Sequence, residues 1–286
     1  MACRPDTVGG VNRVGVALIV NVCKRTYRKT LEPGWIDAII RDNIAPISEC
    51  WVLINNVNDR EHAASLARNL VANDELTGFQ FVQDVIGRAL KTTGMPRRTL
   101  QRRGYFLDFG LAVAITGTAP YLVGWDAETA LSAPGDWITP GIGLLERDRS
   151  LFSVSPRWPA SRDTLSEEAI SFAPPWTRNF GFSDQAFLVR RADVARPIYR
   201  SFAPAALARN FNHPFSFEAR VEAHQGASGR TRATHTEISY TTNDLADVIV
   251  RTGGYSAREK LVRKLLLLTR AALLRLRWRS PRYRLP

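Results

Sequence analysis

Apolar runs rich in β-branched residues alternate with amphipathic segments along the first half of the chain. The runs predict strands over 14–23, 50–57, 79–84 and 120–125. The segments between and after them predict helices over 31–42, 60–73, 99–116 and 137–147. Because strands and helices follow one another in turn, this half predicts an α/β domain with a mainly parallel sheet flanked by helices.

The pattern changes after about residue 149. Prolines and tryptophans mark a loop-rich segment, and short strands are expected over 151–154 and within 182–194. Residues 230–240 alternate between apolar and polar side chains, which is typical of a further strand. A long leucine-rich helix is predicted over 256–279.

Polar side chains follow each of the four strands predicted in the first half. In a parallel sheet the carboxyl ends of neighbouring strands lie at one edge, where ligands of such sheets bind. Taken singly, each cluster also suits an ordinary loop or helix N-cap. Four clusters together favour a shared site. They are Asn21 to Thr26, Asn55 to Asp59, Gln83 with Asp84, and Asp126 with Glu128.

Asp126 and Glu128 are one residue apart at the end of the fourth strand. Side chains alternate along a strand, so both carboxylates are expected on one side of the chain, where they can hold one divalent cation. Hard oxygen ligands suit Mg²⁺ or Mn²⁺. The alternative interpretation is a solvated turn at the end of a strand.

Composition narrows the class of protein. The 286 residues are 45% hydrophobic and 23% charged, as in an ordinary globular protein. Cys3, Cys23 and Cys50 have no paired spacing, which argues against a disulfide framework or a zinc site and favours a reducing cytoplasm. We expect no signal peptide and no transmembrane segment, because every apolar run is too short.

The net charge of +12 first suggests a nucleic-acid-binding protein, but it is unevenly placed. Residues 258–286 contain ten Lys or Arg and one acidic residue, so most of the charge belongs to this tail. A basic groove interleaved with aromatic residues is missing from the rest of the sequence, so we expect no nucleic-acid partner.

The order and spacing of these features over residues 14–240 resemble family 2 glycosyltransferases of the GT-A fold. In that family the first strand and the loops after strands two and three hold the nucleotide, and a helix leads into a strand that ends in an Asp-x-Asp metal motif. Here the helix starts at Asp108 and the motif looks like Asp126-Ala127-Glu128. Glu128 departs from the usual aspartate.

The resemblance implies a metal-dependent transferase that moves a sugar from a UDP-, GDP- or dTDP-sugar to a glycan or lipid-linked acceptor, as in polysaccharide biosynthesis. An inverting transfer needs a base for the acceptor hydroxyl. Asp184 corresponds to the family's later acid, although Ser183 replaces the usual glutamate before it. A turn or N-cap aspartate is the alternative role. The residues expected to bind the nucleotide sugar are Asn21, Asn56, Asn58, Asp84, Asp108, Trp125 and Asp126.

Two further groups of side chains have both a binding and a structural interpretation. Arg190 and Arg191 are expected either to contact phosphate or to form an ordinary surface pair. Trp125, Trp137, Trp158 and Trp176 are expected either to form a floor on which a sugar stacks or to belong to the core.

We predict a catalytic domain over residues 1–250, with a nucleotide-binding half at about 14–130 and an acceptor half at about 131–250. Residues 251–286 form a basic amphipathic helix and tail. This helix suits an anionic membrane surface, which places the protein in the cytoplasm on the inner face of a membrane. Packing on the domain or in a homodimer is the alternative. A catalytically inactive GT-A-like protein that binds nucleotide or glycan is the alternative function.

Overall fold

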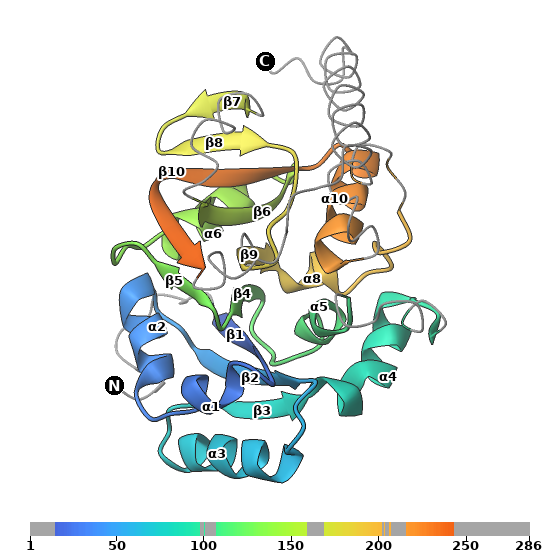
Figure 1. Ribbon diagram of the computed structural model, residues 1–286. Coiled ribbons are helices and arrows are strands. Elements are labelled where there is room, and N and C mark those ends of the chain that lie inside the picture. The colour runs from blue at the N-terminus through green and yellow to red at the C-terminus, as the bar shows by residue number, and fades with distance from the viewer. Residues whose placement is uncertain are drawn as a thin grey trace, which may run out of the picture.

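The computed structural model describes residues 15–97, 100, 107–158, 169–201, 203, 206 and 216–242. Figure 1 shows the helices and strands of these segments. The predicted basic helix and tail over 251–286 lie outside the described residues, as does Cys3.

Four parallel strands form the first half of the sheet. Their order is β3-β2-β1-β4, so β1 lies between β2 and β4. β1 is buried along most of its length because Val, Ile and Leu dominate it, as expected for a strand covered on both faces. The bounds are β1 Val16–Cys23, β2 Glu49–Asn55, β3 Gly78–Phe81 and β4 Tyr121–Asp126.

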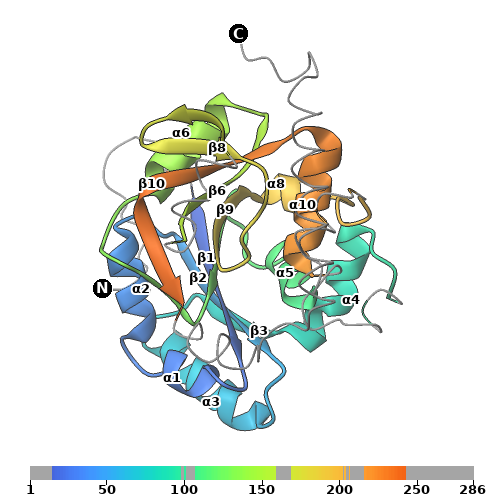
Figure 2. The same ribbon diagram turned by 45° about the horizontal axis from the view of Figure 1, so that its top comes forward.

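The sheet continues beyond β4 with strands of mixed direction. β9 is antiparallel to both β4 and β6, and β10 is parallel to β6. Figure 2 shows β10 as a long bent strand. Its last residues pair with β5, which follows β4 in the chain. The bounds are β5 Thr129–Leu131, β6 Leu151–Arg157, β7 Ala169–Ala173, β8 Trp176–Asn179, β9 Ala186–Arg190 and β10 Thr231–Thr242.

Helices cover both faces of the sheet, and each face has its own apolar core. The first face carries α1 Tyr27–Thr30, α2 Trp35–Asn43, α3 Arg60–Ala72 and α6 Ile138–Arg147. The second face carries α4 Val82–Thr93, α5 Asp108–Val113, α8 Arg191–Val194 and α10 Phe217–Ser228. The predicted α/β fold with a parallel core sheet is therefore confirmed.

Side-chain alternation along β1 assigns its residues to the two faces. Val20 and Val22 belong to the first core, whereas Ala17 and Ile19 belong to the second. Asn21 follows Ile19 by two residues and therefore points toward the second face. The second face is consequently the one that receives polar groups at the carboxyl edge of the sheet.

Two predicted elements are placed differently. The expected strand over 79–84 ends at Phe81, and α4 begins at Val82, so Asp84 lies on a helix. The reason is the spacing of buried Val82, Ala89 and Leu90, which suits one helical face against the second core. The helix expected over 99–116 is described only as α5, Asp108–Val113.

Candidate functional site

The carboxyl ends of β2, β1 and β4 meet at one edge of the sheet. Asn21 of β1 lies opposite Asp126 of β4, and Cys23 lies opposite Asn55 of β2. Three segments that are far apart in the sequence therefore bring their polar residues to one place, as the strand-end clusters predict.

A cavity of about 490 Å³ opens between the loops that follow β1 and β2. Two of the residues predicted to bind the nucleotide, Asn56 and Asn58, line it. Asn56 has a φ of 50°, a left-handed conformation that asparagine tolerates better than most residues. The same cavity carries two positive charges. Its lining residues are Cys23, Lys24, Arg25, Asn56, Val57 and Asn58.

Asp126 and Glu128 form a compact turn at the end of β4. The backbone N–H of Glu128 donates to Asp126 Oδ1 at 2.9 Å, and the N–H of Asp126 donates to the carbonyl of Gln185 at 2.8 Å. The Glu128 carboxylate pairs with Arg25, whose Nη2 lies 3.1 Å from Oε1 and 3.3 Å from Oε2. The Glu128 carboxylate therefore lies beside the loop that follows β1 and lines the cavity.

Asp184 precedes β9 and lies close enough to Asp126 for their charges to interact. Burial raises the pKa of Asp184 to about 6, and the negative charge of Asp126 adds to this increase. A carboxylate with a raised pKa is a stronger base, which suits proton removal from a hydroxyl group. Beside it, the hydroxyl groups of Ser183 and Tyr240 lie 2.8 Å apart.

Asp108 connects α5 to the polar edge of the sheet. Its Oδ1 accepts from Asn55 Nδ2 at 3.1 Å and from the N–H of Phe109 at 2.7 Å. Gln83 of α4 extends this chain of contacts, since its Nε2 donates to Asn55 Oδ1 at 3.1 Å and to Asn56 Oδ1 at 3.2 Å. Asp108 thus reaches the cavity through three amide side chains.

The oxygen atoms at the end of β4 suit a hard divalent cation that is shared with a ligand. Asn21 Oδ1 is buried and has no hydrogen-bond partner among the described residues. In the described ranges, no three His, Cys, Asp or Glu side chains gather around one point. Mg²⁺ is commonly held by one or two carboxylates, with the other positions filled by substrate phosphates and water. Asp126 and Glu128 fit that kind of site.

Two predicted nucleotide-binding residues have other contacts. Trp125 points to the first face of the sheet, away from Asp126; it is 2% exposed, and its Nε1 donates to the carbonyl of Thr129 at 3.0 Å. Its side chain therefore belongs to the core because strand residues alternate between faces. Asp84 is exposed on α4 and pairs with Arg60 at 2.6 Å.

Trp137 and Trp176, two further members of the predicted tryptophan floor, do not line the cavity. Trp137 is fully buried, and its Nε1 donates to Asn43 Oδ1 at 2.7 Å. Trp176 lies in β8 and packs edge-on against His235, with ring centroids 4.7 Å apart. These two tryptophans stabilise the domain, because each packs inside it against a partner side chain.

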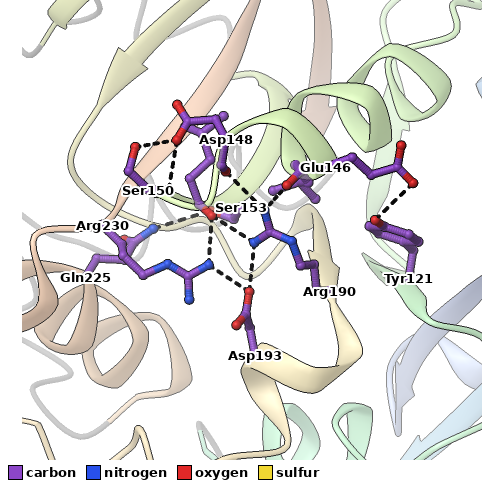
Figure 3. A network of polar contacts seen from close by, with 11 residues as sticks. Tyr121, Glu146, Asp148, Ser150, Ser153, Arg190, Asp193, Gln225 and Arg230 are labelled. Carbon is purple, nitrogen blue, oxygen red and sulfur yellow. Dashed lines mark hydrogen bonds and ion pairs between the residues drawn. The ribbon is translucent and has the colours of Figure 1, made fainter. Parts of the chain in front are cut away.

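Arg190 and Arg191 were expected to contact phosphate or to form a surface pair, and both interpretations are wrong. Figure 3 shows Arg190 in a buried network, where its Nη1 donates to Asp193 Oδ2 at 2.8 Å. Arg191 donates to the carbonyls of Thr116 and Ala119, in the turn that precedes β4. That turn lies at the amino end of β4, opposite the candidate site.

The contacts of Arg25 and Gln83 were missed at the sequence level, although both belong to the strand-end clusters. Their partners lie 103 and about 28 residues away, respectively. A signal was present in each case: a basic pair directly after β1, and a glutamine directly before Asp84.

The course of the chain agrees with the resemblance on four points. Parallel strands deliver polar ends to one edge, α5 leads into β4, β4 ends at Asp126, and a later carboxylate lies beside it. The chain has an α/β fold in which these four features come in the order that the resemblance predicts.

Comparison with solved structures finds glycosyltransferases among the matches. Glucosyl-3-phosphoglycerate synthase from Mycobacterium tuberculosis, in complex with Mn²⁺, UDP and glucosyl-3-phosphoglycerate, is 13% identical. The match covers 91% of this chain and 81% of that one, with a TM-score of 0.41. The same enzyme has also been solved with Mg²⁺ and UDP.

A second solved structure, GalNAc-T7 with UDP, GalNAc and Mn²⁺, is 9% identical with a TM-score of 0.48. That match covers 81% of this chain and 44% of GalNAc-T7. No protein-family model matches the sequence, and no curated protein does. In the part of the chain that the structure describes, no helix is both long and apolar enough to cross a membrane.

Proposed function

We propose that this protein is a glycosyltransferase that moves a sugar from a nucleoside diphosphate to a glycan or lipid-linked acceptor hydroxyl group. The observation that carries the proposal is that Asp184 lies near enough to Asp126 for their charges to interact, while Glu128, in the same turn as Asp126, pairs with Arg25 of the cavity between the β1 and β2 loops. In this proposal one carboxylate serves the metal–diphosphate and the other takes a proton.

The nucleoside end of the donor fits the cavity between the β1 and β2 loops. Asn56 and Asn58 offer amide groups to the base and ribose, and Lys24 adds a positive charge. From there the diphosphate extends toward the end of β4. Asp126 and Glu128 would hold Mg²⁺ or Mn²⁺, which supplies positive charge against the charge that develops on the departing diphosphate.

Asp184 acts as the base in this proposal. The acceptor hydroxyl loses its proton to the Asp184 carboxylate while its oxygen attacks C1 of the sugar, and the bond from C1 to the diphosphate breaks. A displacement of this kind inverts the configuration at C1. The interaction between the charges of Asp184 and Asp126 supports a distance at which both can act on one donor.

The first test is donor binding. A panel of UDP-, GDP- and dTDP-sugars, screened by thermal shift with and without Mn²⁺, should yield at least one donor that raises the melting temperature only with metal. Asp126→Ala should abolish that increase. Asp42→Ala, on α2 and outside the site, should retain it. Metal-dependent stabilisation that survives in Asp126→Ala contradicts the metal site.

The second test separates binding from chemistry. In Asp184→Asn the donor should bind as in the wild type, whereas transfer and donor hydrolysis should fall by about 10²- to 10⁴-fold, the usual contribution of a general base. With a donor that carries a radiolabelled sugar, label on the acceptor measures transfer and free labelled sugar measures hydrolysis. A wild type that binds a donor with Mn²⁺ but neither transfers nor hydrolyses its sugar supports the alternative, an inactive GT-A-like binding protein.

A further inference from the structure

Arg25 belongs to two parts of the proposed site at once. It lines the cavity between the β1 and β2 loops, and its guanidinium contacts the Glu128 carboxylate at 3.1 Å. In the sheet, β1 lies between β2 and β4. A ligand that extends from the β2 loop to Asp126 therefore passes the β1 loop, where Arg25 is.

Arg25 and a divalent cation have the same partner. A metal held by Asp126 and Glu128 needs the carboxylate that Arg25 already contacts, and the guanidinium charge repels a cation beside it. The pair is accessible to solvent, with 46% of the Arg25 side chain and 23% of the Glu128 side chain exposed. Exposed ion pairs of this kind are weak enough to exchange partners.

A diphosphate changes this competition. Arginine binds phosphate oxygens through two parallel N–H groups, so a diphosphate beside the β1 loop offers Arg25 a second anionic partner. Once Arg25 turns to the phosphate, Glu128 is available to the metal. Nucleotide binding then makes Glu128 accessible to the metal, and metal binding at Glu128 lets Arg25 contact the diphosphate.

We propose that Arg25 couples the binding of metal and nucleotide: it neutralises Glu128 while the site is empty and transfers to the diphosphate when a metal occupies Glu128. This inference rests on the proposed function of the site. Coupling between two ligands is reciprocal, so the factor by which the nucleotide tightens metal binding equals the factor by which metal tightens nucleotide binding.

The test titrates the wild type and the Arg25→Met variant with Mn²⁺. Electron paramagnetic resonance measures how much Mn²⁺ is free at each step. Titrations are made alone and with saturating UDP, GDP or dTDP. Compared with the wild type, the variant should bind Mn²⁺ alone several-fold more tightly. The factor by which the best diphosphate tightens Mn²⁺ binding should fall by about 10-fold, within the usual range of coupling between sites. It should not fall to one, because the phosphates themselves are metal ligands.

Lys24→Met is the matched control. Lys24 lines the same cavity and its loss removes the same charge, so it should weaken diphosphate binding but leave the affinity for Mn²⁺ alone within about twofold. Arg25→Lys keeps the charge without the planar fork and should give an intermediate coupling factor. Both side chains are exposed, so neither substitution removes core packing.

Two negative results have different meanings. If the wild type binds a diphosphate with Mn²⁺, and Arg25→Met retains both its Mn²⁺ affinity and its coupling factor, the role of Arg25 is refuted and the proposed function stands. If the wild type binds none of the three diphosphates with or without Mn²⁺, the proposed function fails, and the inference about Arg25 fails with it.

Discussion

Asp108 is a largely buried carboxylate whose negative charge lowers the stability of the folded protein. Burial raises the pKa of Asp108 from 3.8 to about 6, although hydrogen bonds from Asn55 and from the backbone N–H of Phe109 oppose the increase. The folded protein therefore binds this proton more tightly than the unfolded chain. Consequently the free energy of unfolding falls as the pH rises from about 4 to about 6, and this loss persists at higher pH.

Asp108→Asn should remove this cost. An asparagine oxygen can still accept from Asn55 and Phe109, while the charge disappears. At pH 8 the variant should be more stable than the wild type by about 1 to 3 kcal/mol, and at pH 4 the difference should be small, because the wild-type carboxyl is then protonated. Urea unfolding at both pH values measures the two differences. Equal stabilisation at both would contradict the assigned role of the buried charge.

The same substitution tests whether the charge serves the site. A charge retained at a cost in stability is typical of binding and catalytic positions. We expect Asp108→Asn to bind the donor more weakly, by calorimetric titration, even though it is more stable at pH 8. Asp42→Asn, on α2, is the control and should change neither property.

At the scale of elements, hydrophobic patterning was enough to predict the parallel strands. β1, β2 and β4 are short apolar runs bounded by polar clusters, and each lies within two residues of its predicted start. α4 was missed because Val82 to Thr93 has the apolar run of β3 directly before it, without the turn residues that usually separate a strand from a helix. Such a junction is decided by packing on the second core.

Helix packing at α5 depends on a glycine. A Cβ atom at Gly110 would lie 2.2 Å from the ring of Phe217 in α10, whereas a Cβ at Gly87 in α4 would meet nothing within 4 Å. Gly110→Ala should therefore lower the free energy of unfolding by about 1 to 3 kcal/mol through overpacking. Gly87→Ala should raise it by about 0.5 to 1 kcal/mol, since alanine loses less conformational entropy in a helix.

Denaturant unfolding of the two glycine variants checks this contrast. Because both positions are helical and receive the same methyl group, helix propensity affects them alike, and the difference in sign reports the contact with Phe217. If Gly110→Ala proved as stable as Gly87→Ala, α5 would not pack on α10 as closely as described.

At the scale of the whole molecule, the site is assembled from pairings that patterning alone does not reveal. The strand-end clusters predicted that polar residues of several strands meet at one edge of the sheet, because parallel strands share one carboxyl edge. They did not predict that Arg25 pairs with Glu128, and they left open whether Trp125 faces the core or the site. Those outcomes depend on the register of β1 against β4 and on which face each residue of β4 points to.

A buried network, shown in Figure 3, links the end of β9 to the starts of β6 and β10, beside the amino end of β4 and therefore away from the candidate site. Asp193 Oδ2 accepts from Arg190 Nη1 at 2.8 Å and from Arg230 Nη2 at 2.7 Å, and both arginines also donate to the carbonyl of Leu151. Burial alone would raise the pKa of Asp193, but the hydrogen bonds from Arg230 and Arg190 outweigh it and lower the pKa. The carboxylate therefore stabilises the fold above its unfolded pKa and loses this effect as the pH falls through its folded value.

Asp193→Asn should consequently leave the buried guanidinium of Arg190 and the partly buried one of Arg230 without the Asp193 charge. It should lower the free energy of unfolding by about 3 to 5 kcal/mol at pH 7, the usual cost of breaking a buried ion pair. The difference from the wild type should narrow in acid, where the wild-type carboxyl is protonated as well. Asp84→Asn breaks the exposed pair with Arg60 and should cost less than about 1 kcal/mol. Urea unfolding of the three proteins at pH 7 and in acid measures both effects. A cost at Asp193 no larger than that at Asp84 would mean that the network does not hold β9, β6 and β10 together.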